Sequence, residues 1–212
     1  MYQPPHFIAD DLPQMLAFLA AHPLGLLVTR GEGVPVVDAV PFRHVPEEAG
    51  FGRLEAHVAR ANPLWRLHDP AEPVVVVFQG PEHYVSPGWY ATKAETGKVV
   101  PTWNYSLVQA TGRLVVHDDP VWVRGQIERL TAAHESGRPA PWAVGDAPDA
   151  FIAAQLRGIV GIEVRIDALV GKFKLSQNRN PADRSGVIAG LDEEATAPAA
   201  AVAALMRGPS AD

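Results

Sequence analysis

Segments with the pattern of β-strands follow one another along most of this chain, and few of the connections between them are helical. Residues 24–42 read as two strands around a Gly-Glu-Gly turn, and the central residues of PVVVVFQG (73–80) are β-branched, as in a buried strand. Longer strands are expected over residues 99–117 and 158–175. Strands and helices do not alternate regularly, which disfavours a doubly wound parallel sheet. The pattern favours a small antiparallel barrel with added helices, and an open α+β sheet is the alternative.

The remaining elements are indicated by caps and turn residues. Helices are expected where an acidic or amide side chain precedes a proline: from Asp10-Asp11, at Asn62-Pro63 and from Asp119 to about Ser136. Further expected elements are strands at 52–60 and 82–87, a mobile polar loop at 91–98, a helix at 149–157 and a polar, then helical segment at 176–191. We therefore expect one domain over residues 1–191, followed by an Ala-rich helix or tail over 192–212, with its last residues frayed.

Composition excludes several classes of protein. The 212 residues are 47% apolar, enough to bury a core, and the net charge of −6 does not favour nucleic acid. There is no Cys, which excludes disulfides, thiolate metal sites and a Cys nucleophile. The N-terminus lacks the pattern of a signal peptide, and no apolar run approaches the ~20 residues that span a bilayer. A soluble, cytoplasmic protein without a membrane partner is expected.

The stretch HVARANPLW, residues 57–65, combines a strand end, a turn and a helix start. Free backbone N–H groups at a helix start attract anions, and a guanidinium binds phosphate through two parallel hydrogen bonds. His57, Arg60 and the amides near Asn62 are thus candidates for a phosphate site. A surface arginine, a core histidine and an ordinary Asn cap explain the same residues.

The stretch VPTWNY, residues 100–105, places two large aromatic residues on one strand face. Trp103 and Tyr105 share that face, and Asn104 points to the other. A flat heteroaromatic ring would stack on the aromatics while Thr102 or Asn104 bonds its edge. Base rates of aromatic burial favour core packing instead.

The stretch GKFKLSQNR, residues 171–179, gathers polar side chains at a strand end. Lys172 alternates with Phe173, so it shares one strand face with Lys174. Gln177 and Arg179 follow within a dense run of hydrogen-bonding side chains that suits a polar ligand edge. A solvated strand end would look the same.

Known catalytic and metal-binding motifs are missing. The chain has no G-x-S-x-G, H-E-x-x-H, Walker A or G-x-G-x-x-G sequence, and its histidines lack metal-ligand spacing. Neither a catalytic residue nor a metal ligand is assigned from the sequence.

Five stretches in the same order resemble one family. MYQPPHF, HVARANPLW, YVSPGWYATK, VVPTWNY and KLSQNRNPADRSGVIAGL, which together run from Met1 to about Leu191, are similar to the PaiB-like proteins. These are described as FMN-binding negative transcriptional regulators linked to protease production and sporulation.

The resemblance implies an FMN-binding split β-barrel that forms a homodimer, with FMN in the cleft between subunits. His57, Arg60 and Asn62 would suit the phosphate of FMN, and Thr102, Trp103, Asn104 and Tyr105 its ring. Lys172, Gln177 and Arg179 would suit the phosphate, the ribityl chain or the pyrimidine oxygens, and residues 38–40 would add backbone groups.

Two functions of different class fit this resemblance. One is a negative transcriptional regulator, with DNA left open as a partner because no helix-turn-helix is evident and the chain is acidic. The other is an FMN-dependent oxidoreductase, because the same fold hosts flavin reductases and oxidases and fold does not fix function. A module without flavin is disfavoured, since its polar patches would then be left unpaired.

Overall fold

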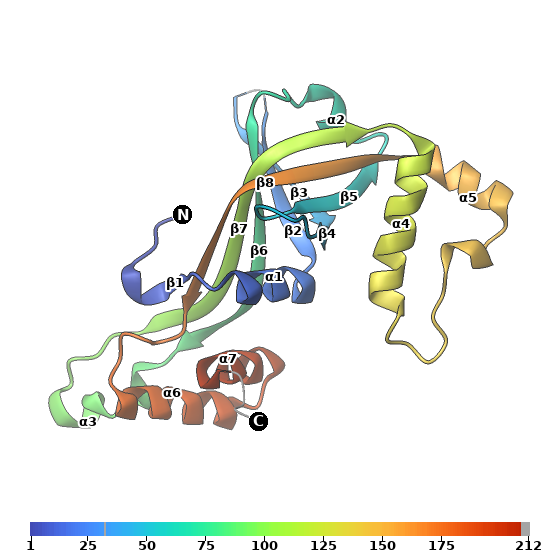
Figure 1. The fold of residues 1–212 in the computed structure, drawn as a ribbon. Helices are drawn as coiled ribbons and strands as arrows, with labels where there is room; N and C mark the ends of the chain where they lie inside the picture. Colours follow the sequence, from blue (N-terminus) through green and yellow to red (C-terminus); the bar gives the residue numbers. More distant parts are fainter. Residues whose placement is uncertain (32, 209–212) are drawn as a thin grey trace. The chain divides into compact units, whose positions relative to one another are not determined.

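The computed structural model describes residues 1–31 and 33–208 of the chain (Figure 1). Eight strands form a sheet in the order β3-β2-β6-β7-β8-β5-β4, and β1 pairs with β8. The chain divides into two compact units. Unit 1 comprises Met1–Met15, Gln79–Val108 and the part from Val170 onward, and unit 2 comprises Leu16–Phe78 and Gln109–Leu169.

Unit 2 is built around antiparallel strands. Its strands are β2 (Leu24–Arg30), β3 (Pro35–Pro41), β4 (Arg43–Val45), β5 (Arg53–Ala59) and parts of β6 (Pro73–Val85), β7 (Thr102–His117) and β8 (Ile159–Lys174). β2 and β3 pair from Leu24 opposite Pro41 to Arg30 opposite Pro35, which confirms the predicted hairpin, although Glu32 lies outside the described residues. The core consists of fully buried aliphatic and aromatic side chains such as Leu27, Leu54, Val76, Phe78 and Ile162.

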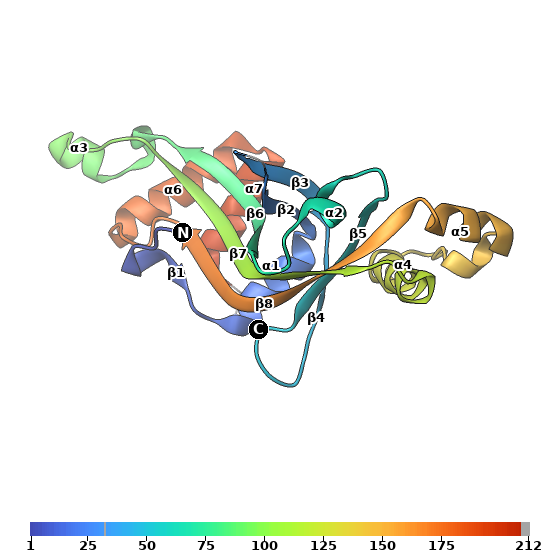
Figure 2. The ribbon, with the colours of Figure 1, turned by 90° about the horizontal axis from the view of Figure 1, so that it is seen from above.

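Helices flank the strands of unit 2, and those predicted from caps at Asp10-Asp11, Asn62 and Asp119 are present. They are α1 (Leu12–Ala21, whose first residues belong to unit 1), α2 (Leu64–Leu67), α4 (Pro120–Glu135), the 3-10 turn η3 (Val144–Asp146) and α5 (Asp149–Leu156). The carboxylate of Asp119 accepts a hydrogen bond from the Val121 amide, as an N-cap does. α4 and α5 lie side by side in both views (Figures 1 and 2).

Unit 1 contains the two chain ends and the remaining helices. Its elements are η1 (Pro5–Phe7), β1 (Ile8–Ala9), η2 (Pro87–Trp89), α3 (Thr92–Thr96), α6 (Pro181–Glu194) and α7 (Ala197–Arg207). Asn180 and Thr196 cap the N-termini of α6 and α7, which pack against each other (Figure 1). The Trp89 ring lies against Gly190, where any side chain would overlap it.

Two expectations about single elements are wrong, and two short strands were not predicted. One strand, β6 (Pro73–Val85), replaces the two expected over residues 73–80 and 82–87, and its central valines alternate between buried and half-buried, so only one face is fully covered. Residues 91–98 contain a helix, α3, whose start is held by bonds from Thr92 to the Asp183 carboxylate. The short strands β1 and β4 are absent from the sequence prediction because two or three residues give no measurable alternation.

The fold class is confirmed as mainly β, antiparallel and flanked by helices. Within the described residues the strand order begins at β3 and ends at β4, so the hydrogen-bonded path is open. The domain boundary predicted at residue 191 stays a prediction, and the frayed end predicted for the tail falls partly on residues outside the described ones. No helix in the described part of the chain is long and apolar enough to cross a membrane.

Close approach of β7 and β8 in unit 2 requires a glycine. A Cβ atom on Gly112 would overlap the carbonyl oxygen of Arg165, which is backbone and cannot swing away. We therefore expect Gly112→Ala to lower the free energy of unfolding by about 1–3 kcal/mol, measured by urea denaturation. The control is Gly145→Ala, because nothing lies within 4 Å of a Cβ there. Equal stability of the two variants would contradict the close approach.

Candidate functional site

Three cationic side chains gather in unit 1 where β8 ends. Lys172 and Lys174 lie two residues apart on β8, and Arg179 follows before α6. Lys172 is only 9% exposed, which is unusual for a lysine. We call Lys172, Lys174 and Arg179 the cation cluster.

Aromatic rings surround the cation cluster. The Lys172 Nζ lies 5.5 Å from the centre of the Tyr2 ring and 5.4 Å from that of Tyr105. The Lys174 Nζ lies 5.9 Å from the Tyr105 ring, and the Arg179 guanidinium lies 4.6 Å from the ring of Tyr90. Ring faces attract cations but leave their charge uncompensated. These contacts hold the cations in place while leaving them able to meet an anion.

No carboxylate in the part of the chain that the structure describes forms an ion pair with the cation cluster. None of the ion pairs among the described residues includes Lys172, Lys174 or Arg179. Burial lowers the pKa of Lys174, and the charges of Lys172 and Arg179 lower it further. Lys174 does donate to the Thr102 hydroxyl and to the Trp103 carbonyl, but both acceptors are neutral. The cluster is therefore a site of uncompensated positive potential that an anion would stabilise.

Strand β7 presents the aromatic residues outward. Trp103 is 51% exposed and meets the Tyr84 ring edge to face, whereas Asn104 is fully buried. The alternation predicted for residues 103–105 is confirmed, and the core-packing interpretation is wrong for Trp103. The exposed face borders a cavity of about 230 Å³, lined by Gln79, Glu82, Trp103, Tyr105 and Leu107. Because its ring also faces the lysines, Tyr105 links this cavity to the cation cluster.

Asn104 and Gln177 have internal partners. The Asn104 amide accepts a bond from the Ser176 hydroxyl and donates to the Met206 sulfur of α7. The Gln177 side chain donates to the Phe173 carbonyl and accepts from the Leu175 amide. These bonds fix the turn that follows β8, where Ser176 has a φ of 62°. The structure gives both residues a role in positioning the turn, and their contact with a ligand stays a prediction.

The other residues predicted to bind phosphate lie in unit 2, where the Arg60 side chain already has hydrogen-bond partners. Its guanidinium bonds both oxygens of Asp118 and also donates to the carbonyls of Arg157 and Ile159. The Arg60 side chain holds the pKa of Asp118 below its ordinary value. Four of the five N–H donors of Arg60 are therefore occupied inside the protein. Binding of phosphate by Arg60 stays a prediction that this geometry does not favour.

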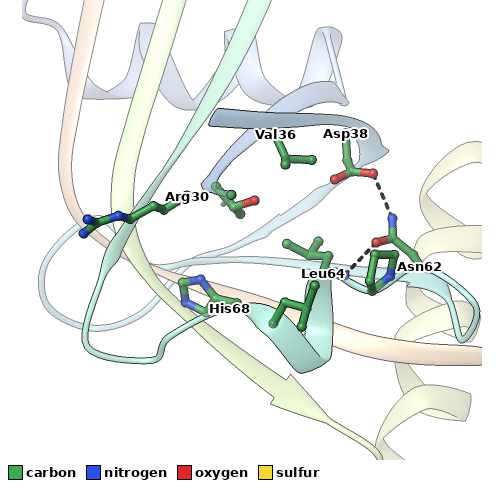
Figure 3. A pocket seen from close by; sticks show the side chains of 10 residues that line it. Arg30, Val36, Asp38, Asn62, Leu64 and His68 are labelled. Carbon is green, nitrogen blue, oxygen red and sulfur yellow. Dashed lines mark hydrogen bonds between the residues drawn. The ribbon is translucent and has the colours of Figure 1, made fainter. Parts of the chain in front are cut away.

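His57 and Asn62 also have protein partners. The His57 Nδ1 lies 2.9 Å from the Gln126 Oε1. Asn62 accepts from the Leu64 amide, as predicted for a residue at a helix start, and donates to the Asp38 Oδ1 (Figure 3). Asn62 and Asp38 line a cavity of about 300 Å³, in which the Asp38 Oδ2 has no hydrogen-bond partner within the described residues. An unpaired carboxylate repels phosphate, so this cavity is a poor place for one.

The structure thus divides the predicted site. Thr102, Trp103, Asn104, Tyr105, Lys172, Gln177 and Arg179 belong to unit 1, and His57, Arg60 and Asn62 to unit 2. Sequence reasoning missed Tyr2 as a neighbour of Lys172 and left Lys174 out of the assigned residues. The alternation of Lys172 with Phe173 was the available signal for Lys174, whereas nothing local indicated Tyr2.

Comparison with known proteins agrees with this fold. A model of the family described as "Putative FMN-binding domain" matches residues 1–168. The chain is 34% identical to an uncharacterized protein of Aspergillus fumigatus, over 87% of this chain and 88% of that protein. It is 29% identical to protease synthase and sporulation protein PAI 2 of Bacillus subtilis, over 97% of this chain and 96% of that protein.

Solved structures share the fold at low sequence identity. A FAD and heme binding protein from Mycobacterium smegmatis superimposes with a TM-score of 0.60 at 18% identity, covering 86% of this chain and 80% of that one. The flavocytochrome Anf3 from Azotobacter vinelandii gives a TM-score of 0.58 at 16% identity, covering 79% and 69%. At this level of identity the likeness concerns the fold.

The repulsion within the cation cluster can be measured directly. Replacing Lys172 by Met removes a like charge next to Lys174, so the pKa of Lys174 is expected to rise toward its usual value while burial still holds it below. NMR titration of the lysine Cε resonances checks this. Lys98→Met, which removes an exposed lysine of the same unit, serves as the control. An unchanged pKa of Lys174 in Lys172→Met would show that the two amines do not interact.

Proposed function

Because this chain belongs to the family described as "Putative FMN-binding domain", we propose that it binds FMN through the cation cluster and the aromatic face of β7. The observation that carries the proposal is the cation cluster itself. It holds three positive groups that form no ion pair within residues 1–31 and 33–208, two of them on one strand face. FMN carries a phosphate dianion, a flexible ribityl chain and a flat ring, and each needs a different surface.

The cation cluster suits the phosphate. The Lys172 side chain makes no hydrogen bond within the described residues, so all three of its N–H donors are available. The Arg179 guanidinium offers a planar pair of donors of the kind that binds phosphate. Phosphate oxygens would replace neutral acceptors and relieve the repulsion that lowers the pKa of Lys174.

The aromatic face of β7 suits the flavin ring. Trp103 and Tyr105 stand on the exposed side of the strand, and Leu107 continues the same side two residues further. A flat heteroaromatic ring gains both apolar burial and favourable offset stacking on such a surface. The bound flavin would supply redox chemistry, and the residues of this chain would orient it and set its electrostatic surroundings.

We also propose a homodimer, supported by an apolar sheet face in unit 2. The pairing register places Leu26 opposite Ala39 and Val28 opposite Val37, so these side chains share one face. Leu26 and Val37 on that face are 39% and 56% exposed. A contiguous exposed apolar patch of this kind marks an interaction surface, and two copies related by a twofold axis would cover each other's patch.

We propose a negative regulator of transcription as the role of the FMN-bound dimer. Its support is the nearly full-length similarity to the Bacillus subtilis protein named for protease synthesis and sporulation. DNA is the partner this role needs, and with a net charge of −6 contact would depend on a local basic surface and weaken steeply with salt. The alternative is an FMN-dependent oxidoreductase. Turnover of the flavin with a nicotinamide cofactor, without salt-sensitive DNA binding, would identify the protein as the oxidoreductase.

FMN binding can be tested by comparing FMN with riboflavin, which lacks the phosphate. We expect the wild-type protein to prefer FMN, and Lys172→Met to reduce that preference about tenfold or more, because a charge-assisted bond to phosphate is lost. Flavin absorbance and fluorescence titrations give the two affinities for each variant.

Two further variants locate the phosphate. Lys98→Met, an exposed lysine of unit 1, should leave the preference unchanged, and so should Arg60→Gln, whose donors already have protein partners. Loss of the preference in Arg60→Gln but not in Lys172→Met would move the phosphate to the turn at residues 57–62. A protein that takes up neither flavin would refute the cofactor assignment.

The proposed homodimer should dissociate when a charge is placed on its apolar interface. Val37→Arg places a cation on the apolar face and is expected to convert the dimer to monomer, observed by sedimentation velocity. Val34→Arg is the matched control, because Val34 is 70% exposed and lies outside β3. A wild-type protein that sediments as a monomer, or a dimer unaffected by Val37→Arg, would contradict this interface.

A further inference from the structure

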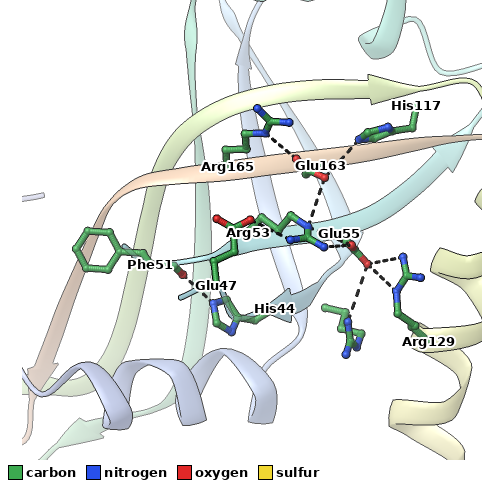
Figure 4. Close-up of polar contacts among 10 residues, drawn as sticks. His44, Glu47, Phe51, Arg53, Glu55, His117, Arg129, Glu163 and Arg165 are labelled. Atoms are coloured by element: carbon green, nitrogen blue, oxygen red, sulfur yellow. Dashed lines mark hydrogen bonds and ion pairs between the residues drawn. The ribbon is translucent and has the colours of Figure 1, made fainter. Parts of the chain in front are cut away.

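Two buried carboxylates face each other in unit 2. Glu55 on β5 and Glu163 on β8 occupy directly opposed positions in the strand register, with 1% and 5% exposure (Figure 4). Like charges at opposed positions repel, and burial increases their energetic cost. Such a pair persists only where cations surround it.

Arginines supply those cations. Three of them lie near Glu55, whose carboxylate has two oxygen atoms. The Glu55 Oε1 accepts from Arg53 at 3.1 and 3.2 Å, and the Oε2 accepts from Arg129 at 2.9 and 3.1 Å. A third guanidinium, that of Arg43, stays 3.9 Å from the Oε2, beyond hydrogen-bond distance. Arg165 and His117 approach Glu163 instead.

Arg43 therefore meets Glu55 as an ion pair at 3.9 Å without a hydrogen bond. Its side chain makes no hydrogen bond within the described residues, and its buried Nη1 has only the 3.9 Å ion pair with Glu55. A guanidinium forms up to five hydrogen bonds, and a partly buried one that forms none is costly. The remainder of the side chain, 30% exposed, lines a cavity.

The cavity lined by Arg43 has apolar walls and no acidic residue. Its volume is about 290 Å³, and its walls come from α1, β4 and α4. Leu16, Ala20 and Leu130 make the walls apolar, and the polar side chains facing it are Arg43, His44 and His134. His44 donates from its Nε2 to the Phe51 carbonyl, which leaves its other ring nitrogen available. We call this cavity the Arg43 pocket.

We propose that the Arg43 pocket binds a compact organic carboxylate with an apolar body. The carboxylate would pair with the guanidinium of Arg43, in the two-bond geometry that arginine favours, and the apolar body would lie between α1 and α4. At ~30 Å³ per water-sized unit the cavity admits on the order of ten non-hydrogen atoms. This site is independent of the proposed flavin site, because its residues all belong to unit 2 and the cation cluster to unit 1.

Phenylacetate, which has an aromatic ring and one carboxylate, is a suitable probe. We expect it to shift the NMR resonances of His44 and His134 in a saturable manner, with phenylacetamide and phenethylamine binding at least tenfold more weakly. Arg43→Gln should weaken phenylacetate binding about tenfold, the loss of one charge-assisted contact. Arg165→Gln is the matched control: Arg165 also pairs with a buried glutamate but does not line the pocket.

A second variant keeps the charge and fills the space. Ala133→Phe adds a ring at an exposed position on the wall of the pocket and should abolish binding, with thermal unfolding confirming that the variant is folded. Equal binding of the acid, the amide and the amine, or unchanged binding in Arg43→Gln or Ala133→Phe, would overturn the proposal. Flavin titrations on the same variants keep the two sites distinct: a protein that binds no flavin but binds phenylacetate supports the Arg43 pocket alone.

Discussion

Alternation along β7 and β8 is the constraint on which the candidate site depends. Successive side chains of a strand point to opposite faces, so a run such as Trp103-Asn104-Tyr105 has to be divided between them. Asn104 takes the buried face and reaches α7, while the two aromatic rings face outward. On β8 the same rule places Lys172 and Lys174 together. The two-residue alternation of a β-strand thus places the side chains of both the aromatic face and the cation cluster.

The two units treat buried charge in opposite ways. In unit 2 the carboxylates of Glu55 and Glu163 are surrounded by arginines, and both carboxylates form ion pairs. In unit 1 Lys172 and Lys174 are held by aromatic rings and neutral acceptors, and neither forms an ion pair with a carboxylate in the described part of the chain. Charges that are paired stabilise a fold at best weakly, whereas charges left unpaired and partly buried are typical of a site that binds something. The same reasoning distinguishes Arg43, which meets Glu55 at 3.9 Å without a hydrogen bond, from Arg53, Arg129 and Arg165, which hydrogen-bond to carboxylates.

Sequence patterns predicted the elements that depend on local chemistry. The cap at Asp119 marks a real helix start, and the strand expected over residues 99–117 is present as β7. Separate strands were expected over residues 73–80 and 82–87, yet β6 continues from one into the other because pairing with neighbouring strands outweighs local preference. The sequence did not predict which side chains meet in the tertiary structure. Nothing near Arg60 indicates that Asp118, 58 residues away, occupies its guanidinium.

The comparison between Arg60 and Lys172 shows why residue type alone does not locate a site. Both are cations at strand ends and both suited phosphate in the sequence. Only their partners separate them: Arg60 has a carboxylate and two carbonyls, and Lys172 has two ring faces. The cation cluster also lies beyond residue 168, where the family match ends, whereas Arg60 lies within it. Similarity to the Bacillus subtilis protein extends over 97% of the chain, so the matched region includes the cation cluster. The assignment of the phosphate to Lys172 therefore stands on uncompensated charge, a property that follows from three-dimensional neighbours.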